Sequence, residues 1–434
     1  MQPVKTVLEM LHGDGFLKAM SVLYPEGQLN TQKKRYIDAV NSFATLYGAD
    51  REITFISAPG RTEIGGNHTD HQNGRVLAAS VNLDVICVVS KNGDNTVRIK
   101  SEGYPQDIVA LHDLEKKDAE TDKAISLIRG ILSRFKQLGY TIGGFDAYTT
   151  SNVLKGSGLS SSAAFEVAVG TVLSRIFNGG KADAATIAKI GQYAENVYFG
   201  KPCGLMDQMA SSVGGFVTID FKDPENPEVK AVRFDFAKSG HTLCIVDTKG
   251  SHSDLTPEYS AIPAEMKSVA GFFGKDKLRE VDEVAFYDKL PELRKALGDR
   301  PVLRAMHFFG DNERVLSEVK ALGDGDFEKF KRLVVESGRS SFEILQNVFA
   351  VKEPNEQGLS VALALSEMLL SQKGAWRVHG GGFAGTIQAF VPNEMLEHYR
   401  ALMEKVFGTG SCYELSIRPL GGVEVDKSLA QEGQ

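Results

Sequence analysis

A glycine- and serine-rich segment directly ahead of an apolar run constrains this chain more than any other feature. Residues 156–162 read Gly-Ser-Gly-Leu-Ser-Ser-Ser, and the apolar residues at 163–177 predict a helix behind them. A loop that leads into a helix presents unpaired backbone N–H groups at the positive end of the helix dipole. That arrangement favours anions, and the serine hydroxyls add donors and magnesium ligands, so the segment predicts a polyphosphate-binding loop. The alternative is a Gly/Ser linker capped by serine.

The segment does not follow the commoner nucleotide-binding patterns. None of the Gly-Lys pairs, at Lys181, Lys201 and Lys275, is followed by the Ser or Thr that a P-loop requires. A G-x-G-x-x-G sequence begins at Gly380, but residues 386–391 behind it alternate like a strand. A dinucleotide fingerprint must open a helix, so that interpretation fails on its context.

Composition narrows the class of protein. The chain has 434 residues, enough for two domains, with ordinary apolar (42%) and charged (24%) content. Its net charge of −7 gives no basic surface for nucleic acid or an anionic membrane. The 4 cysteines form no C-x-x-C pair, which suits a reducing cytosol. With no signal-peptide core and no long apolar window, we expect a cytoplasmic protein without a membrane or nucleic-acid partner.

Helical and strand-like segments mix in both halves of the chain without a regular βαβ alternation. Expected strands lie at 53–57, 76–89, 145–150, 216–220, 243–247, 386–391 and 413–419. Expected helices lie within 1–50 and at 122–138, 163–177, 182–198, 261–273, 312–322, 327–348 and 359–372. The pattern predicts two α+β domains, 1–222 and 223–434, with a ligand cleft between them.

Three further segments combine glycine with polar residues. Residues 59–71 read Pro-Gly-Arg-Thr-Glu-Ile-Gly-Gly-Asn-His-Thr-Asp-His, which indicates a glycine-rich turn. It is either a polar surface loop or, through His68 and His71, part of a metal site. Residues 202–208 read Pro-Cys-Gly-Leu-Met-Asp-Gln, where Asp207 taken alone suits a helix cap or a turn. Residues 377–385 hold glycines that suit a tight turn or a close approach to a ligand.

Together these segments resemble the GHMP family of small-molecule kinases, and within it the galactokinase branch. Their order matches: G-R-x-x-x-x-G-x-H-x-D, then G-x-G-L-S-S-S-A-A, then C-G-x-M-D-Q, then a late glycine motif. The resemblance implies an S5-like N-terminal domain and a ferredoxin-like C-terminal domain, with the active site between them. It also implies an ATP- and Mg2+-dependent phosphotransferase whose acceptor is the anomeric hydroxyl of galactose. The implied product is α-D-galactose 1-phosphate, in the first committed step of galactose catabolism.

The same resemblance implies a role for each motif residue in a monomer whose partners are the sugar and ATP. Asp207 is expected to be the catalytic base, and Arg61 beside it to stabilise charge on the transferring phosphoryl group. Ser162 and Glu195 would hold Mg2+. The phosphates would be wrapped by Gly156, Ser157, Gly158, Leu159, Ser160, Ser161 and Ser162. The sugar would be bound by Asn67, His68, Asp70, Gly204 and Tyr259.

The first motif departs from the family pattern G-R-x-N-x-I-G-E-H-x-D-Y. Glu63, Gly65, Asn67 and His71 stand where that pattern has Asn, Ile, Glu and Tyr. The family carboxylate at position 67 contacts the 6-hydroxyl of the sugar, and hydrogen bonds to charged groups are the stronger kind. Selection at C6 is therefore relaxed, or another residue holds that hydroxyl.

Two alternative functions stay open, and the first of them follows from these departures. One is a 1-kinase for a related sugar such as arabinose or N-acetylgalactosamine, because losing a recognised hydroxyl changes specificity strongly. The other is a catalytically silent sensor of galactose and ATP. The intact loop at 156–164, together with Arg61 and Asp207, argues against the sensor.

Overall fold

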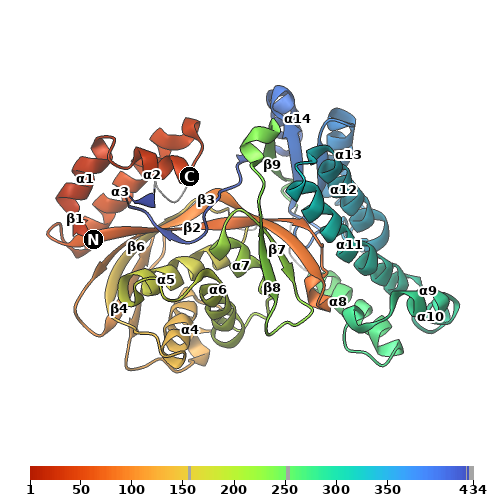
Figure 1. Cartoon of the computed structure of the whole chain (residues 1–434), viewed down its shortest axis with the longest axis horizontal. Coiled ribbons are helices and arrows are strands. Elements are labelled where there is room, and N and C mark those ends of the chain that lie inside the picture. The colour runs from red at the N-terminus through yellow and green to blue at the C-terminus, as the bar shows by residue number, and fades with distance from the viewer. Residues whose placement is uncertain (155–157, 251–254, 427, 430–434) are drawn as a thin grey trace.

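The computed structural model describes residues 1–154, 158–250, 255–426 and 428–429, and Figure 1 shows their arrangement around two sheets. Within the described residues, the larger sheet has nine strands and the smaller has four. The strands of the larger sheet are β1 (Gln2–Pro3), β2 (Glu52–Gly65), β3 (Arg75–Lys91), β4 (Thr96–Ser101), β5 (Gln106–Ala110), β6 (Phe145–Ser151), β7 (Phe216–Asp220), β8 (Glu228–Val232) and β13 (Val423–Glu424). Both sheets carry helices, which agrees with the predicted α+β class.

The long antiparallel strands β2 and β3 hold the larger sheet together. β1, β3 and β13 pair with β2, while β6 and β7 also pair with β3. Successive side chains of a strand point to opposite faces. Accordingly, Phe55 and Ile86 pack in one core cluster, and their neighbours Ile56 and Cys87 pack in another. The sheet is therefore covered on both faces, which explains why its strands read as long apolar runs.

The helices of this half cover the two faces. They are α1 (Val4–His12), α2 (Leu17–Leu23), α3 (Leu29–Tyr47), α4 (Ala124–Gln137), α5 (Ser161–Asn178), α6 (Ala184–Tyr193) and α7 (Met206–Val213). In Figure 1, α1–α3 lie above the long strands, and α4–α6 lie below them. A π-helical turn, η4 (Ala194–Phe199), continues α6 and carries Glu195. Such turns are frequent at functional sites.

Residues 59–65 are not the turn that the sequence predicted, because they continue β2. The pairing of β2 with β3 shifts register between Pro59 and Arg61 and again between Glu63 and Gly65. These irregularities accommodate the proline, whose missing N–H breaks a ladder position. Gly60 is required because a Cβ there would lie 2.9 Å from the Leu159 carbonyl oxygen. The first motif is thus presented on a bent strand.

The smaller sheet has the strand order β10-β11-β9-β12, all antiparallel. Its strands are β9 (His241–Asp247), β10 (Ala375–His379), β11 (Thr386–Pro392) and β12 (Cys412–Leu415). The helices of this half are α8 (Thr256–Phe272), α9 (Glu283–Asp288), α10 (Leu290–Leu297), α11 (Asp299–Gly323), α12 (Phe327–Ser340), α13 (Gly358–Leu370) and α14 (Leu396–Phe407). The single helix expected at 327–348 instead changes at Ser341 into a π-helical turn, η7 (Ser341–Leu345).

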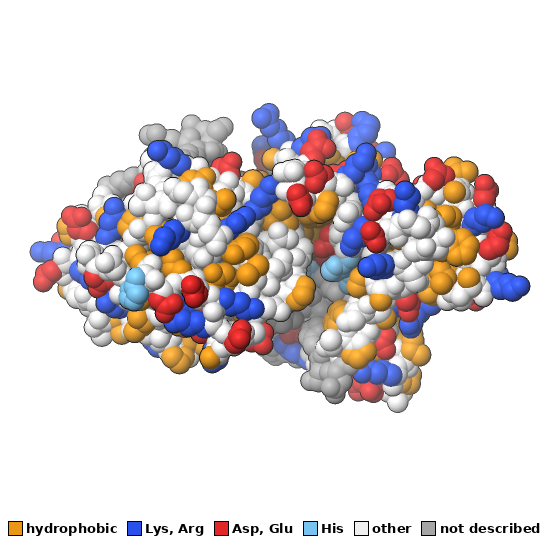
Figure 2. Space-filling view, turned by 90° about the horizontal axis from the view of Figure 1, so that it is seen from below, with side chains coloured by type: hydrophobic (Ala, Val, Ile, Leu, Met, Phe, Trp, Pro, Cys, Tyr) orange, Lys and Arg blue, Asp and Glu red, His pale blue; other side chains and the backbone are white. Residues whose placement is uncertain are grey.

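The two halves share strands and a core. β8 and β13 come after residue 222 in the chain yet join the larger sheet, so the C-terminal segment returns to the N-terminal helices (Figure 1). The largest core cluster includes Ile56 of the larger sheet, Leu243 of the smaller sheet and Phe330 of α12. Figure 2 shows the surface indented between the two halves. No helix within the described residues is both long and apolar enough to cross a membrane.

Candidate active site

Arg61 and Asp207, which the sequence predicts to be a catalytic pair, are in direct contact. Arg61 lies on β2 with 7% of its surface exposed. Its Nε and Nη2 atoms lie 2.8 and 2.7 Å from Asp207 Oδ1. Asp207 lies in the first turn of α7, and about a third of its side chain (32%) is exposed. A buried guanidinium therefore fixes a carboxylate that still faces outward.

Asp207 is kept ionised by its neighbours. Burial alone would raise the pKa of Asp207, but the Arg61 charge and hydrogen bonds from Arg61 and Ser160 outweigh it. The pKa of Asp207 is consequently lowered from its ordinary value. A carboxylate in this state can accept a proton throughout the neutral range.

The end of the glycine-serine loop is anchored beside this pair. Gly156 and Ser157 lie outside the described residues. Arg61 donates hydrogen bonds from Nη1 to the Gly158 carbonyl and from its backbone N–H to the Leu159 carbonyl. Ser160 adopts a left-handed conformation (φ 56°), and α5 starts at Ser161. The first N–H groups of α5 therefore open next to Asp207, as a phosphate site requires.

Ser162 and Glu195, the predicted magnesium ligands, are brought together from α5 and η4. Ser162 Oγ lies 3.5 Å from Glu195 Oε1. Lys201 Nζ lies 3.3 Å from the same oxygen, and Gln208 Nε2 donates to Glu195 Oε2 at 2.8 Å. Mg2+ favours oxygen ligands and usually takes only one or two from the protein, the rest coming from phosphates and water. This hydroxyl and carboxylate fit such an ion.

A second buried carboxylate, Glu166, lies behind the magnesium ligands. Gln208 Nε2 also donates to Glu166 Oε2 at 2.9 Å, while Glu166 Oε1 is buried without a hydrogen-bond partner among the described residues. Burial, followed by the charge of Glu195, raises the pKa of Glu166 well above its ordinary value. Sequence reasoning missed this residue because it falls inside an apolar helical run. Its position one turn after Ser162 was the available signal.

Two of the predicted sugar ligands, Asp70 and Gly204, lie next to each other. A Cβ on Gly204 would lie 2.8 Å from Asp70 Oδ2, so any other residue there would push that carboxylate aside. Asp70 begins a short helical turn, η2 (Asp70–Gln72), and 16% of its side chain is exposed. The first motif and the C-G-x-M-D-Q motif are therefore in contact through these residues.

His68 and Tyr259 both contact the late glycine motif. His68 Nε2 lies 3.0 Å from the Gly381 carbonyl oxygen, and the Tyr259 hydroxyl donates to the Gly382 carbonyl at 2.8 Å. Burial, and then the neighbouring His71, lowers the pKa of His68 to about 4, so its ring is neutral at physiological pH. Because a carbonyl only accepts, Nε2 carries the proton and Nδ1 is left as an acceptor.

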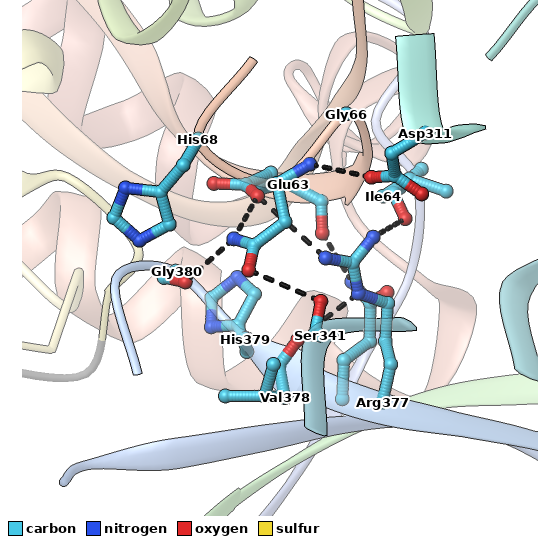
Figure 3. Close-up of polar contacts among 12 residues, drawn as sticks. Glu63, Ile64, Gly66, His68, Asp311, Ser341, Arg377, Val378, His379 and Gly380 are labelled. Carbon is cyan, nitrogen blue, oxygen red and sulfur yellow. Dashed lines mark hydrogen bonds and ion pairs between the residues drawn. The ribbon is translucent and has the colours of Figure 1, made fainter. Parts of the chain in front are cut away.

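Asn67 differs from the other predicted sugar ligands because all hydrogen bonds of its amide are made inside the protein. Three of its partners, Glu63, Gly380 and Ser341, are labelled in Figure 3. Its Nδ2 donates to Glu63 Oε1 at 2.7 Å and to the Gly380 carbonyl at 2.9 Å. Its Oδ1 accepts from Ser341 at 3.2 Å and from Asn347 at 2.8 Å. Only 1% of Asn67 is exposed.

The alternative metal site would need ligands besides His68 and His71, and the described residues supply none. The two rings are tilted with centroids 5.7 Å apart. No group of three or more His, Cys, Asp or Glu side chains that could hold a metal ion occurs in the part of the chain that the structure describes.

Family models and relatives agree on the class of protein. The model for the GHMP kinases N terminal domain matches residues 126–215, and the galactokinase galactose-binding signature matches residues 41–91. A galactokinase of Actinobacillus pleuropneumoniae serotype 3 (strain JL03) is 30% identical over 375 residues, covering 84% of this chain and 92% of that protein. A galactokinase of Glaesserella parasuis serovar 5 (strain SH0165) is 31% identical over 352 residues, covering 80% of this chain and 88% of that protein. The matched domain is that of a GHMP kinase. Within that class, the chain belongs to the galactokinase family.

Solved structures confirm the fold. The crystal structure of Lactococcus lactis galactokinase complexed with galactose superposes with a TM-score of 0.74 at 24% identity, covering 88% of this chain and 98% of that chain. The Methanococcus jannaschii mevalonate kinase superposes with a TM-score of 0.61 at 12% identity, covering 84% and 98%. These matches confirm the predicted two-domain α+β architecture of the GHMP kinases.

Proposed function

We propose that this protein transfers the γ-phosphoryl group of ATP to the anomeric hydroxyl of galactose and releases α-D-galactose 1-phosphate and ADP. The observation that carries this proposal is the contact of Asp207 with Arg61 beside the N-terminus of α5, in a chain of the galactokinase family. The galactokinase names of the relatives and the galactose-binding signature support galactose as the acceptor. We propose the cytoplasm as its location and the monomer as its functional unit.

In the proposed reaction, Asp207 accepts the proton and Arg61 stabilises negative charge. The anomeric oxygen attacks the γ-phosphorus, the bond to the β,γ-bridging oxygen breaks, and the hydroxyl proton passes to Asp207. An Asp carboxylate is a weak base for a ground-state alcohol, so it accepts the proton late, when bond formation has made the hydroxyl acidic. Arg61 holds that carboxylate ionised and faces the charge that spreads over the transferring group.

The phosphates and the metal occupy the N-terminus of α5 in this proposal. Backbone N–H groups from Gly158 to Ser162 bind the phosphate oxygens, and we propose the same role for Gly156 and Ser157. Ser162 and Glu195 would hold Mg2+, which would neutralise charge on the phosphates when bound. Gln208 orients Glu195 from behind, and the neutral form of Glu166 favoured by its raised pKa lessens repulsion between the two carboxyl groups.

His68, Asp70, Gly204 and Tyr259 form the sugar-binding side of this site in our proposal. The Asp70 carboxylate accepts from sugar hydroxyls in the space that Gly204 leaves open. His68 offers a neutral ring whose Nδ1 accepts, and Tyr259 closes the site from α8. A 1-kinase for arabinose or N-acetylgalactosamine is the second candidate. It is favoured by the enclosed amide of Asn67, at the position where the family pattern has glutamate.

The function is tested by ADP release with ATP and Mg2+ against galactose, N-acetylgalactosamine, glucose, arabinose and fucose. We expect galactose to give the highest kcat/KM. A highest value on arabinose or N-acetylgalactosamine would establish the second candidate instead. ADP release that no sugar stimulates would contradict both.

Replacing Glu195 with Gln is expected to raise the Mg2+ concentration for half-maximal activity by about 10- to 100-fold, because an anionic ligand is lost. The measurement is a Mg2+ titration of turnover at saturating ATP and galactose. Glu228→Gln is the matched control, since Glu228 lies on β8 in an exposed ion pair with Lys230. A Glu195→Gln titration that overlays the control would contradict the proposed metal site.

A further inference from the structure

We propose that Glu63 recognises the sugar in this enzyme, its carboxylate accepting a hydrogen bond from one substrate hydroxyl while Asn67 holds it in position. The inference rests on the proposed function and assigns a specificity-determining residue to that site. The sequence left open that a residue other than Asn67 binds the sugar hydroxyl, and Glu63 is that residue in this proposal.

Asn67 has no hydrogen-bonding capacity left for a substrate. An amide side chain offers two N–H donors and two acceptor lone pairs, and all of them are used within the protein. Its backbone is held as well, because its N–H donates to Asp311 and its carbonyl accepts from His307, both at 2.9 Å. A sugar could reach Asn67 only by breaking one of these bonds.

Glu63 points to the same side of β2 as the catalytic arginine. Residues two apart on a strand share a face, and the pairing from Arg61 to Glu63 is regular, opposite Ser80 and Ala78 of β3. Burial and then the Arg377 charge have the largest effects on the pKa of Glu63, and smaller effects of Arg61 and Asp70 show that both of these charges lie in its surroundings. Glu63 is therefore on the substrate side of the strand.

The two oxygens of Glu63 are not equivalent. Oε1 accepts from Asn67 Nδ2 at 2.7 Å and lies 3.7 Å from Arg377 Nη2. Oε2 has no hydrogen bond with any described residue. It is also not one of the fully buried atoms that lack a partner, so it is still accessible. In Figure 3 this second oxygen lies on the His68 side of the carboxylate. One oxygen is thus held by the protein, and the other is open toward a proposed sugar ligand.

The charge of Glu63 is only partly compensated by the protein. Burial raises its pKa, and Arg377 and the Asn67 hydrogen bond offset that effect incompletely. Arg377 is itself buried, and its other groups donate to the backbone carbonyls of Ile64 and Val378. A carboxylate in this situation gains a strong bond from a hydroxyl donor that arrives with the substrate.

The test is a cycle of enzyme variants and substrate analogues. Wild type and Glu63→Gln are compared for kcat/KM on galactose and on its 2-, 3-, 4- and 6-deoxy analogues. We expect Glu63→Gln to lose about 10- to 100-fold on galactose, the value of a hydrogen bond to a charged group. For the one analogue that lacks the recognised hydroxyl, wild type and Glu63→Gln should have the same kcat/KM. An equal loss on galactose and on every analogue would overturn the proposal.

Glu318→Gln is the matched control. Glu318 is a buried carboxyl group whose pKa is raised to about 8 by burial, and a Cβ on Gly65 of the first motif would lie 1.8 Å from its Oε2. Any change in kcat/KM that Glu318→Gln causes should be the same factor for galactose and for every analogue. Glu63→Asp keeps the charge but moves it away from the substrate, because its side chain is shorter. It should give the same dependence of kcat/KM on the analogue, and it keeps the test valid if Glu63→Gln misfolds. Wild type that fails to phosphorylate galactose would refute the proposed function itself, a result distinct from an analogue-independent Glu63 effect.

Asn67→Ala tests whether Asn67 positions Glu63 or binds the sugar directly. If Asn67 acts through Glu63, this variant should lower discrimination at the same hydroxyl that Glu63→Gln identifies. The KM for ATP should stay unchanged. A loss of equal size on all analogues would contradict the positioning role.

Discussion

Asp207→Asn is expected to lower kcat on galactose by about 100- to 10,000-fold, the usual contribution of a general base. The amide keeps the shape of the side chain but cannot take the proton. ATP binding should be largely preserved, because the N–H groups at the start of α5 do not depend on that charge. The measurement is steady-state turnover together with the ATP dissociation constant for each variant.

Asp220→Asn provides the comparison for this result. Asp220 is also a partly exposed aspartate in an arginine pair, here with Arg75 and Arg279 at the end of β7. Its replacement removes similar ion pairs without touching the site. Turnover of Asp207→Asn close to that of Asp220→Asn would refute Asp207 as the base.

Arg61→Gln is expected to lower kcat/KM by about 1,000-fold or more, as loss of a transition-state arginine does in other phosphoryl transfers. The variant loses the contacts of Arg61 with Asp207 and with the Gly158 carbonyl at once. It should also change the pH profile. In the wild type, the Arg61 charge opposes the effect of burial and lowers the pKa of Asp207.

Without that charge, burial dominates, so the pKa of Asp207 rises. Because the ionised form is the active one, activity should be lost at a higher pH on acidification than in the wild type. The measurement is the acid limb of kcat/KM against pH for both proteins. An acid limb that stays in place would show that Arg61 does not control the ionisation of Asp207.

Local sequence signals predicted much of the molecule. The helix at 163–177 corresponds to α5, because apolar spacing and the serines before it point to the same helix start. The strand at 386–391 corresponds to β11 for a similar reason. The structure also brings Arg61 to Asp207 and Ser162 to Glu195, pairs that the family resemblance had joined across 146 and 33 positions of the chain.

What the sequence missed depends on long-range packing. Residues 59–65 looked like a turn because they contain proline and glycine, but pairing with β3 keeps them extended. The expected helix at 312–322 begins at Asp299, since tertiary burial of residues such as Phe308 extends it beyond the clear periodicity. The partnership of Glu63 with Asn67 was equally hidden, because each was read alone as a departure from a motif rather than as one hydrogen-bonded pair.

The most direct test of the account is 31P NMR of the product formed from galactose, ATP and Mg2+. The proposed site predicts α-D-galactose 1-phosphate, with the phosphorus coupled to the anomeric proton, and formation of this product at a rate lowered by the same large factor as kcat when Asp207 is replaced by Asn. Phosphate on the 6-hydroxyl, or inorganic phosphate as the only product, would contradict the assignment of Asp207 and Arg61 to transfer onto the anomeric oxygen.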